Sequence, residues 1–233
     1  MIWVAGVDGC PAGWLAVFRS AAEHRAQIYQ KISEILDAPE RPTIVAVDIP
    51  IGLQPNSKKG GRRADIEARQ VLKYRKSSIF PAPSRPALKA TSFEEAKEIE
   101  KANSTPPKKL ARQAYNLFCK IRELDAIAAD HLGVIFECHP EVSFWAMNNK
   151  TDMSLSKRKR AGFEDRCQLL ARNGFDSRFL ETRLGFWDEH SLNDLADACV
   201  AAWTAERILR KEAVRFPATP EIDETGLDMA IWA

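Results

Sequence analysis

Aspartate residues follow two apolar runs near the start of the chain. Asp8 closes the run IWVAGVD, and Asp48 closes the run TIVAVD. A carboxylate at the end of a fully apolar run is poorly solvated unless a cation or several hydrogen-bond donors compensate its charge. Mg²⁺ and Mn²⁺ prefer such hard oxygen ligands, and Mg²⁺ often combines one or two carboxylates with phosphate oxygens. Asp8 and Asp48 are therefore the first candidates for a catalytic metal site.

A second pair of acids lies in the segment LNDLADACVAAW, which has helical spacing. Asp194 and Asp197 are three residues apart, so they share one face of a helix whose other positions are apolar. Two-metal phosphoryl chemistry needs a carboxylate cluster around ions about 3.5–4 Å apart. We therefore predict that Asp8, Asp48, Asp194 and Asp197 bind Mg²⁺ or Mn²⁺, with Asp8, Asp48 and Asp197 catalytic.

Two further sets of candidates lie elsewhere in the chain. One is at the end of the short apolar run VIFE, and the other is before and at the start of a proline-rich loop. Glu137 or Glu141 could bind metal, and His139 could act as a general base or orient a water molecule. A single histidine near a strand end also suits a hydrogen-bonded structural role. Guanidinium groups and hydroxyls could hold a phosphate. The candidates for this contact are Arg69, Arg75, Ser77 and Ser78, although Arg69 with Asp65 could instead form a surface ion pair.

Each acid also has a structural alternative. Asp8 precedes Gly9 and could form an Asx turn. Asp48 could accept backbone hydrogen bonds where its strand ends. Asp194 with Ser191 matches a capping box at the start of a helix. The joint pattern of two strand-end aspartates and a helical pair nevertheless favours a cation site.

The elements that would position these residues begin with strands. Residues 2–8, 14–18 and 26–32 are typical of an antiparallel meander, with turn chemistry between the first two. A short helix is expected at 33–38. The β-branched, apolar segment 43–48 is typical of a strand that is buried on both faces.

The remaining chain is mainly helical in pattern. We expect helices at 63–73, 92–102, 107–130, 157–173 and 192–210, and strands at 134–137 and 213–216. A doubly wound fold would alternate strand and helix from the outset, and no GxGxxG follows the first strand. The order instead predicts an α/β, ribonuclease-H-like mixed sheet, in which an antiparallel three-strand meander joins parallel strands flanked by helices. We expect one domain over 1–233, with a mainly helical insertion at about 60–130.

Composition excludes several classes of protein. The 233 residues are 45% hydrophobic and 28% charged, which suits one large globular domain. No apolar run reaches about 18 residues, so no membrane span or membrane partner is expected. The N-terminus is typical of a strand and not of a signal peptide. The five dispersed cysteines lack a CxxC pair and suit reduced thiols, so we expect a cytoplasmic location and no zinc site.

Positive charge is unevenly distributed although the net charge is only +2. Basic clusters occur at 58–63, 73–76, 106–112 and 157–160. Clustered cations can neutralise phosphates, so a nucleic acid or another phosphate-bearing substrate is an expected partner. Solvated helix ends and loops are the alternative. The sequence does not fix the oligomeric state, and a homodimer stays open.

Five motifs in order along the chain carry a family resemblance. They are GVDGCPAGW (6–14), VAVDIPIGL (45–53), RRADIEARQVL with RKSSIFPAPSRPAL (62–88), ECHPEVSFWAM (137–147) and LNDLADACVAAWTAERI (192–208). Together they resemble the domain-of-unknown-function 429 family, whose members are predicted ribonuclease-H-like nucleases. The resemblance implies that Asp8 is the first-strand aspartate and Asp48 the fourth-strand acid. It assigns Asp197, with Asp194, to the last helix.

Three functions are compatible with this sequence. The leading one is a metal-dependent nuclease that hydrolyses phosphodiesters with Mg²⁺ or Mn²⁺. The second is a nucleotide- or phosphometabolite-binding protein of the sugar-kinase and actin type, in which the VDGCPAG turn would hold phosphate. That type needs a second domain of the same topology, for which 233 residues leave little room. The third is a non-catalytic binding protein on the same fold.

Overall fold

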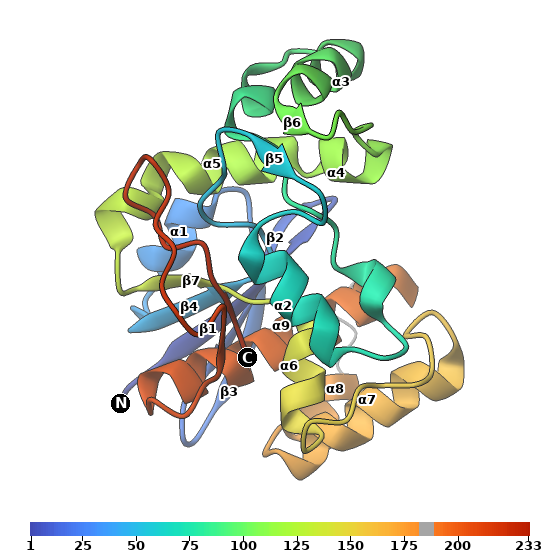
Figure 1. The fold of residues 1–233 in the computed structure, drawn as a ribbon. Coiled ribbons are helices and arrows are strands. Elements are labelled where there is room, and N and C mark those ends of the chain that lie inside the picture. The colour runs from blue at the N-terminus through green and yellow to red at the C-terminus, as the bar shows by residue number, and fades with distance from the viewer. Residues whose placement is uncertain (182–188) are drawn as a thin grey trace.

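The computed structural model describes residues 1–181 and 189–233 and is built around a five-stranded mixed sheet of order β3-β2-β1-β4-β7. The strands are β1 (Val4–Cys10), β2 (Gly13–Arg19), β3 (His24–Tyr29), β4 (Ile44–Val47) and β7 (Ile135–Glu137). The first three form an antiparallel meander, whereas β4 pairs in parallel with both β1 and β7. The prediction of an α/β fold with a mixed sheet flanked by helices is thus confirmed (Figure 1).

The turn between β1 and β2 depends on a glycine. Gly13 has a φ of +137°, and a Cβ atom there would lie 2.1 Å from the carbonyl oxygen of Tyr29 on β3. A side chain therefore fits neither the backbone conformation nor the space. This glycine lets the meander close tightly at the end of the sheet that carries Asp8.

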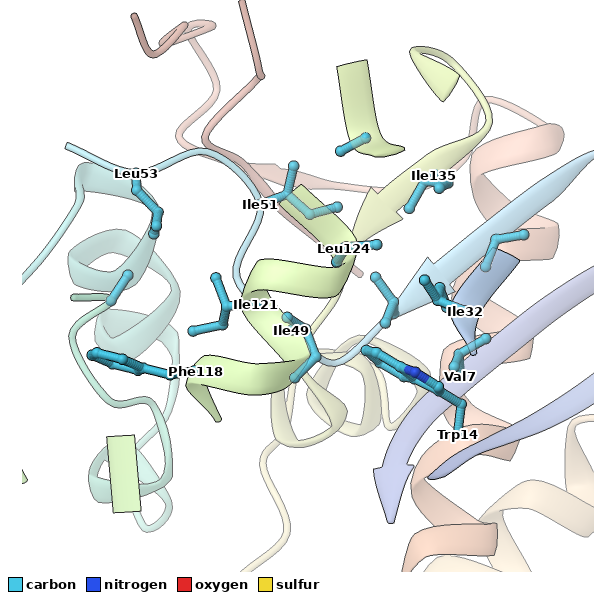
Figure 2. Close-up of a cluster of buried hydrophobic side chains, with 14 of the residues drawn as sticks. Val7, Trp14, Ile32, Ile49, Ile51, Leu53, Phe118, Ile121, Leu124 and Ile135 are labelled. Atoms are coloured by element: carbon cyan, nitrogen blue, oxygen red, sulfur yellow. The ribbon is translucent and has the colours of Figure 1, made fainter. Parts of the chain in front are cut away.

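One face of the sheet packs on α1 (Ile32–Leu36) and α5 (Phe118–Ala128). Side chains alternate along a strand, so Val7 of β1 and Val47 of β4 point to this face. Figure 2 shows Val7 and Trp14 beside Ile32, with Ile121 and Leu124 of α5 nearby. This cluster is the largest part of the hydrophobic core.

The opposite face packs on the long helix α9 (Glu189–Leu209), which crosses the sheet (Figure 1). Val4, Ile44 and Ala46 face this helix through its alanines. Gly6 approaches it most closely, because a Cβ atom on Gly6 would lie only 1.9 Å from the backbone nitrogen of Ala202. The backbones of β1 and α9 are therefore in direct contact.

The chain between β4 and β7 is mainly helical and extends beyond the sheet (Figure 1). Besides α5 it holds β5 (Ser57–Lys58), α2 (Arg63–Val71), the 3-10 helices η1 (Lys76–Ser78) and η2 (Arg85–Lys89), α3 (Phe93–Ala102), β6 (Ser104–Thr105), α4 (Arg112–Asn116) and η3 (Ala129–His131). The expected single helix at 107–130 is wrong. Helical structure starts only at Arg112, and it is interrupted at Leu117 between α4 and α5. The N–H of Leu117 bonds to the carbonyl of Ala114 in a tighter turn.

The C-terminal part contains α6 (Pro140–Met147), α7 (Arg160–Arg172), α8 (Ser177–Glu181), β8 (Arg215–Phe216) and β9 (Ile231–Trp232). Helix α6 was missed because it is buried on nearly all sides and lacks an amphipathic period. The expected helix at 157–173 begins only at Arg160, which leaves Lys157 in a loop. Helix α9 begins at Glu189, three residues before the expected start at 192. The capping box of Ser191 with Asp194 depends on the side chain of Ser191, which lies outside the described side chains. In the described ranges no helix is long and apolar enough to cross a membrane.

The contact at Gly6 predicts a sharp sensitivity to one added methyl group. Gly6→Ala should lower the free energy of unfolding by more than about 3 kcal/mol, because the Cβ atom meets backbone and not a flexible side chain. Urea unfolding of the purified variant measures this change. Gly9→Ala on the same strand is the matched control, since the atoms nearest to its Cβ atom would belong to the flexible side chain of Lys120, at 3.7 Å or more. Equal stability of the two variants would contradict the close contact.

Candidate functional site

Asp8 and Asp48 lie side by side at the carboxyl ends of two parallel strands. Asp8 lies two residues after Gly6 and Asp48 two residues after Ala46, so the alternation of side chains places both on the face that α9 covers. The N–H of Asp48 donates to the carbonyl of Val7 at 3.0 Å, which holds the two strand ends in register. The sequence order of each strand therefore brings two of the predicted carboxylates together.

Helix α9 adds Asp197, whose residue is only 2% exposed. Burial raises the pKa of Asp8 well above its ordinary value, and Asp48, Asp197 and Asp194 raise it further. Burial and then the charge of Asp197 raise the pKa of Asp48 to about 7. These shifts mean that the four predicted metal ligands interact electrostatically, although they come from three separate elements.

Lys157 supplies the positive charge nearest to these acids. Its ammonium group forms an ion pair with the carboxylate of Asp197. Burial lowers the pKa of Lys157, but Asp197, Asp8 and Asp48 outweigh that effect and raise it, so the side chain stays charged. Sequence reasoning missed this residue because it stands in the basic run 157–160 within an expected helix. No signal in the sequence separates it from its basic neighbours.

The loop that carries Lys157 is held by a buried arginine. Arg166 of α7 donates to the carbonyl oxygens of Leu155 at 3.0 Å and Gly162 at 2.8 Å. It also donates to both carboxylate oxygens of Glu141, at 2.9 and 2.8 Å. Because these bonds fix the backbone on both sides of Lys157, its ammonium group is directed toward Asp197.

Glu137 is placed differently from the two strand-end aspartates. It is in register with Val47, so its position on the strand belongs to the face that packs on α5. Its carboxylate accepts hydrogen bonds from Arg62 at 2.5 and 2.7 Å and from the N–H of Ile51 at 2.7 Å. Burial raises its pKa to about 7, although Arg62 opposes this shift. The second partner of Arg62 is Asp65, at 2.7 Å.

Arg69 does not form the surface ion pair with Asp65 that sequence spacing allowed. Asp65 is buried against Arg62, so that alternative is wrong. The guanidinium group of Arg69 donates to the carbonyl oxygens of Ile79 at 3.0 Å and Gly60 at 3.1 Å. These bonds attach the proline-rich loop to α2.

His139 offers an unused acceptor. Its Nε2 lies 3.3 Å from the carbonyl oxygen of Ser78, and since a carbonyl only accepts, Nε2 carries the proton. Burial lowers the pKa of His139, so the ring is neutral at pH 7. Nδ1 is then a lone-pair acceptor, and it is buried without a hydrogen-bond partner among the described residues. This nitrogen could accept a proton or a hydrogen bond from a ligand.

A single cavity of about 490 Å³ joins these groups. The predicted site residues that line it are Asp8, Asp48, Asp197, Glu137, His139, Arg75, Ser77 and Ser78. Lys157 and Glu141 line it as well, whereas Arg69 and Asp194 are not among its lining residues. The structure thus brings eight of the ten predicted residues to one cavity.

The donor set suits a divalent cation in chemistry but not yet in arrangement. Carboxylate oxygens are the ligands that Mg²⁺ and Mn²⁺ prefer, and the raised pKa values of Asp8 and Asp48 reflect burial and neighbouring carboxylates, which a bound cation would offset. Among the side chains that the structure describes, in residues 1–180 and 192–233, however, no three from His, Cys, Asp or Glu are arranged to hold an ion. Metal binding would require the carboxylates to turn and Lys157 to share or release Asp197.

Comparison with known protein families gives a match over most of the chain. The family model described as "Protein of unknown function (DUF429)" matches residues 6–222. This range includes Asp8, Asp48, Lys157 and Asp197. No curated protein and no solved structure matches the chain.

Replacement of Asp48 by asparagine should stabilise the metal-free protein in neutral solution. The pKa of Asp48 is about 7 in the folded protein but near its ordinary value of about 4 in the unfolded chain. The folded state therefore holds this proton more tightly, so stability falls as the pH rises from about 4 to about 7. At pH 8, Asp48→Asn should be more stable than wild type by up to about 4 kcal/mol, a difference that shrinks toward pH 4.

Urea unfolding in EDTA at pH 4, 6 and 8 measures this dependence. Asp130→Asn is the control, because Asp130 is an exposed acid in η3 outside the cavity. Its stability relative to wild type should not follow the same curve. A difference for Asp48→Asn that is constant with pH would contradict the raised pKa.

Arg62 should be essential to stability because it is the shared counter-charge of two buried acids. Arg62→Met would leave Asp65 and Glu137 buried without it, and should lower the free energy of unfolding by about 3–5 kcal/mol. Arg63→Met, at the adjacent position, is the matched control. Arg63 is 49% exposed and pairs with Glu67 at the surface, so its loss should cost less than about 1 kcal/mol. Similar costs for the two variants would contradict the network.

Proposed function

The chain belongs to the DUF429 family, and from this premise we propose that it is a metal-dependent hydrolase of phosphate esters, of the nuclease class. One observation carries the proposal. Asp8 of β1, Asp48 directly after β4 and Asp197 of α9 line one cavity, where burial raises the pKa of both Asp8 and Asp48 and the charge of Asp197 raises both further. Such perturbed carboxylates in a concave site are typical of catalytic centres.

The sheet supports a ribonuclease-H-like core. Three antiparallel strands are followed by strands parallel to β1, in the order β3-β2-β1-β4-β7. We infer that Asp8 and Asp48 are the acids at the carboxyl ends of the first and fourth strands of that core. Ligands in open α/β sheets commonly bind at this end of the strands.

In this reaction Asp8, Asp48 and Asp197 would hold Mg²⁺ or Mn²⁺. When bound, the ion would activate a water molecule and stabilise charge on the leaving oxygen. Lys157 would orient Asp197 and present its ammonium group to a phosphate oxygen. His139, with its free Nδ1 lone pair, would accept a proton from the attacking water. Asp194 would add negative potential from outside the cavity wall.

The substrate phosphate would be held by residues in the 3-10 helix η1 and directly before it. Arg75 lines the cavity and has no carboxylate partner among the described residues. The hydroxyls of Ser77 and Ser78 lie beside it, and that of Ser78 donates to the carbonyl of Arg75 at 2.7 Å. A guanidinium group without an acid partner is suited to bind phosphate.

A small substrate is the second candidate, because five basic residues in the clusters expected to bind a polyanion instead form ion pairs with acids of this chain. These five residues come from three of the four clusters, at 58–63, 106–112 and 157–160. The pairs are Arg62 with Glu137, Arg63 with Glu67, Lys108 with Glu100, Lys157 with Asp197 and Arg160 with Glu164. This engagement favours the nucleotide- or phosphometabolite-binding alternative over a protein that grips a long duplex.

Hydrolysis of bis(p-nitrophenyl) phosphate and of a single-stranded oligonucleotide, with Mg²⁺ or Mn²⁺, tests the reaction. Asp8→Asn and Asp197→Asn should each lower the rate at least about 100-fold, because each removes a carboxylate that stabilises the reacting charges. Mn²⁺ binding measured by calorimetry should weaken in the same variants. Asp130→Asn should retain both activity and binding. Hydrolysis that persists in EDTA, or in Asp8→Asn, would refute the proposal.

A further inference from the structure

The cavity contains an apolar wall in addition to its carboxylates. Residues 79–83 (IFPAP) all line it, together with Arg75 and Arg158. The carboxylates can account for metal and phosphate chemistry, but they give no reason for an aromatic and proline-rich lining. A ligand that fills this cavity should therefore carry an apolar or aromatic part as well as a phosphate.

Phe80 is the aromatic side chain of this wall. It is 42% exposed, whereas its neighbours Ile79 and Ala82 are each 4% exposed. A phenyl ring that lines a cavity and remains exposed has apolar surface that a ligand could cover. Phe80 is thus exposed to the cavity and to solvent, whereas Ile79 and Ala82 are buried in the core.

The backbone around Phe80 is fixed by buried groups. The guanidinium group of Arg69 donates to the carbonyl of Ile79 at 3.0 and 3.2 Å. The carboxylate of Asp65 accepts the N–H of Ala82 at 3.0 Å. Pro81 directly follows Phe80, and Pro83 lies two residues beyond Pro81. Both prolines restrict the backbone further. The ring is therefore presented at the cavity by a braced segment.

Two guanidinium groups complete this part of the cavity. Arg75 donates to the carbonyl of Ser154 at 3.1 Å, and its Nε is buried without a partner. The guanidinium group of Arg158 is exposed and has no hydrogen bond or ion pair within the described ranges. Arg62 and Arg166, in contrast, are each bound to buried carboxylates. Arg75 and Arg158 are thus the arginines of the cavity that keep donors for a phosphate.

We propose that this cavity binds one nucleotide unit, with its base stacked on Phe80 and its phosphate held by Arg75 and Arg158. Aromatic side chains stack on any base, and arginine binds phosphate through paired donors. A cavity of about 490 Å³ is in the range of small-ligand sites. A nucleotide within a duplex would first have to leave the helix to enter it. The chemistry is shared by a free nucleotide and by the end of a single strand.

Calorimetric titration of the full chain in Mg²⁺ tests the inference with adenosine monophosphate, ribose 5-phosphate, (dT)6 and a DNA duplex. Wild type should bind adenosine monophosphate at least about tenfold more tightly than ribose 5-phosphate, because only the former can stack. Phe80→Ala should remove that preference and leave ribose 5-phosphate unchanged, and Phe80→Trp should keep it. Arg75→Gln should weaken both ligands. Tighter binding of (dT)6 than of the mononucleotide would identify strand ends as the source.

Tyr74→Ala is the matched control, since Tyr74 is an aromatic residue that is 54% exposed but is not among the cavity-lining residues. It should bind every ligand as wild type does. Equal binding of adenosine monophosphate and ribose 5-phosphate by wild type would overturn the inference, as would a preference for the duplex. The inference rests on the proposed function only for the placement of the phosphate beside the carboxylates. Binding without any hydrolysis would contradict the proposed reaction and leave the nucleotide site standing.

Discussion

The direct contact between the backbones of β1 and α9 is the constraint on which the site depends. At Gly6, a Cβ atom would lie 1.9 Å from the nitrogen of Ala202 and 2.2 Å from the carbonyl oxygen of Ala198. Asp8 lies two residues after that glycine, and Asp197 is adjacent to Ala198 in the helix. The close approach therefore brings these two carboxylates to the same place. A larger residue at position 6 would move the helix, and with it one side of the acid cluster.

The buried carboxylates fall into two groups, those that are paired with an arginine and those at the candidate site that are not. Glu141 is paired with Arg166, and Glu137 shares Arg62 with Asp65, all as buried groups. Asp8 and Asp48 have no arginine partner in the described ranges and share only the ammonium group of Lys157 with Asp197. Buried pairs with arginine hold elements together, because breaking one leaves an uncompensated charge. The acids without such a partner hold their protons more tightly, and a bound cation could take the place of those protons.

The sequence could indicate the strands and their terminal acids because both depend on local patterns. Apolar runs predicted β1 and β4, and alternation from Gly6 to Asp8 and from Ala46 to Asp48 determines the face of each acid. Glu137 ends a similar run, but only its register with Val47 reveals that it occupies the other face. Lys157 could not be found, since its position depends on where α7 begins and on the bonds of Arg166. Buried helix α6 and the break at Leu117 were missed for the same reason, because tertiary packing decides them.

Bonds within the insertion connect the sheet to the apolar wall of the cavity. Arg62, which precedes α2, binds Glu137 of β7 and donates to the carbonyl oxygens of Ile51 and Gly52 after β4. Asp65, one turn later, accepts from Arg62 and from the N–H of Ala82, so the same network reaches the segment that carries Phe80. Glu137 therefore affects the cavity as a positioning residue even while its own carboxylate is fully engaged. The insertion is not independent of the sheet, because the segment that forms the apolar wall of the cavity is hydrogen-bonded, through Asp65 and Arg62, to β7. Strand β7 pairs with β4, which precedes Asp48, one of the proposed catalytic acids.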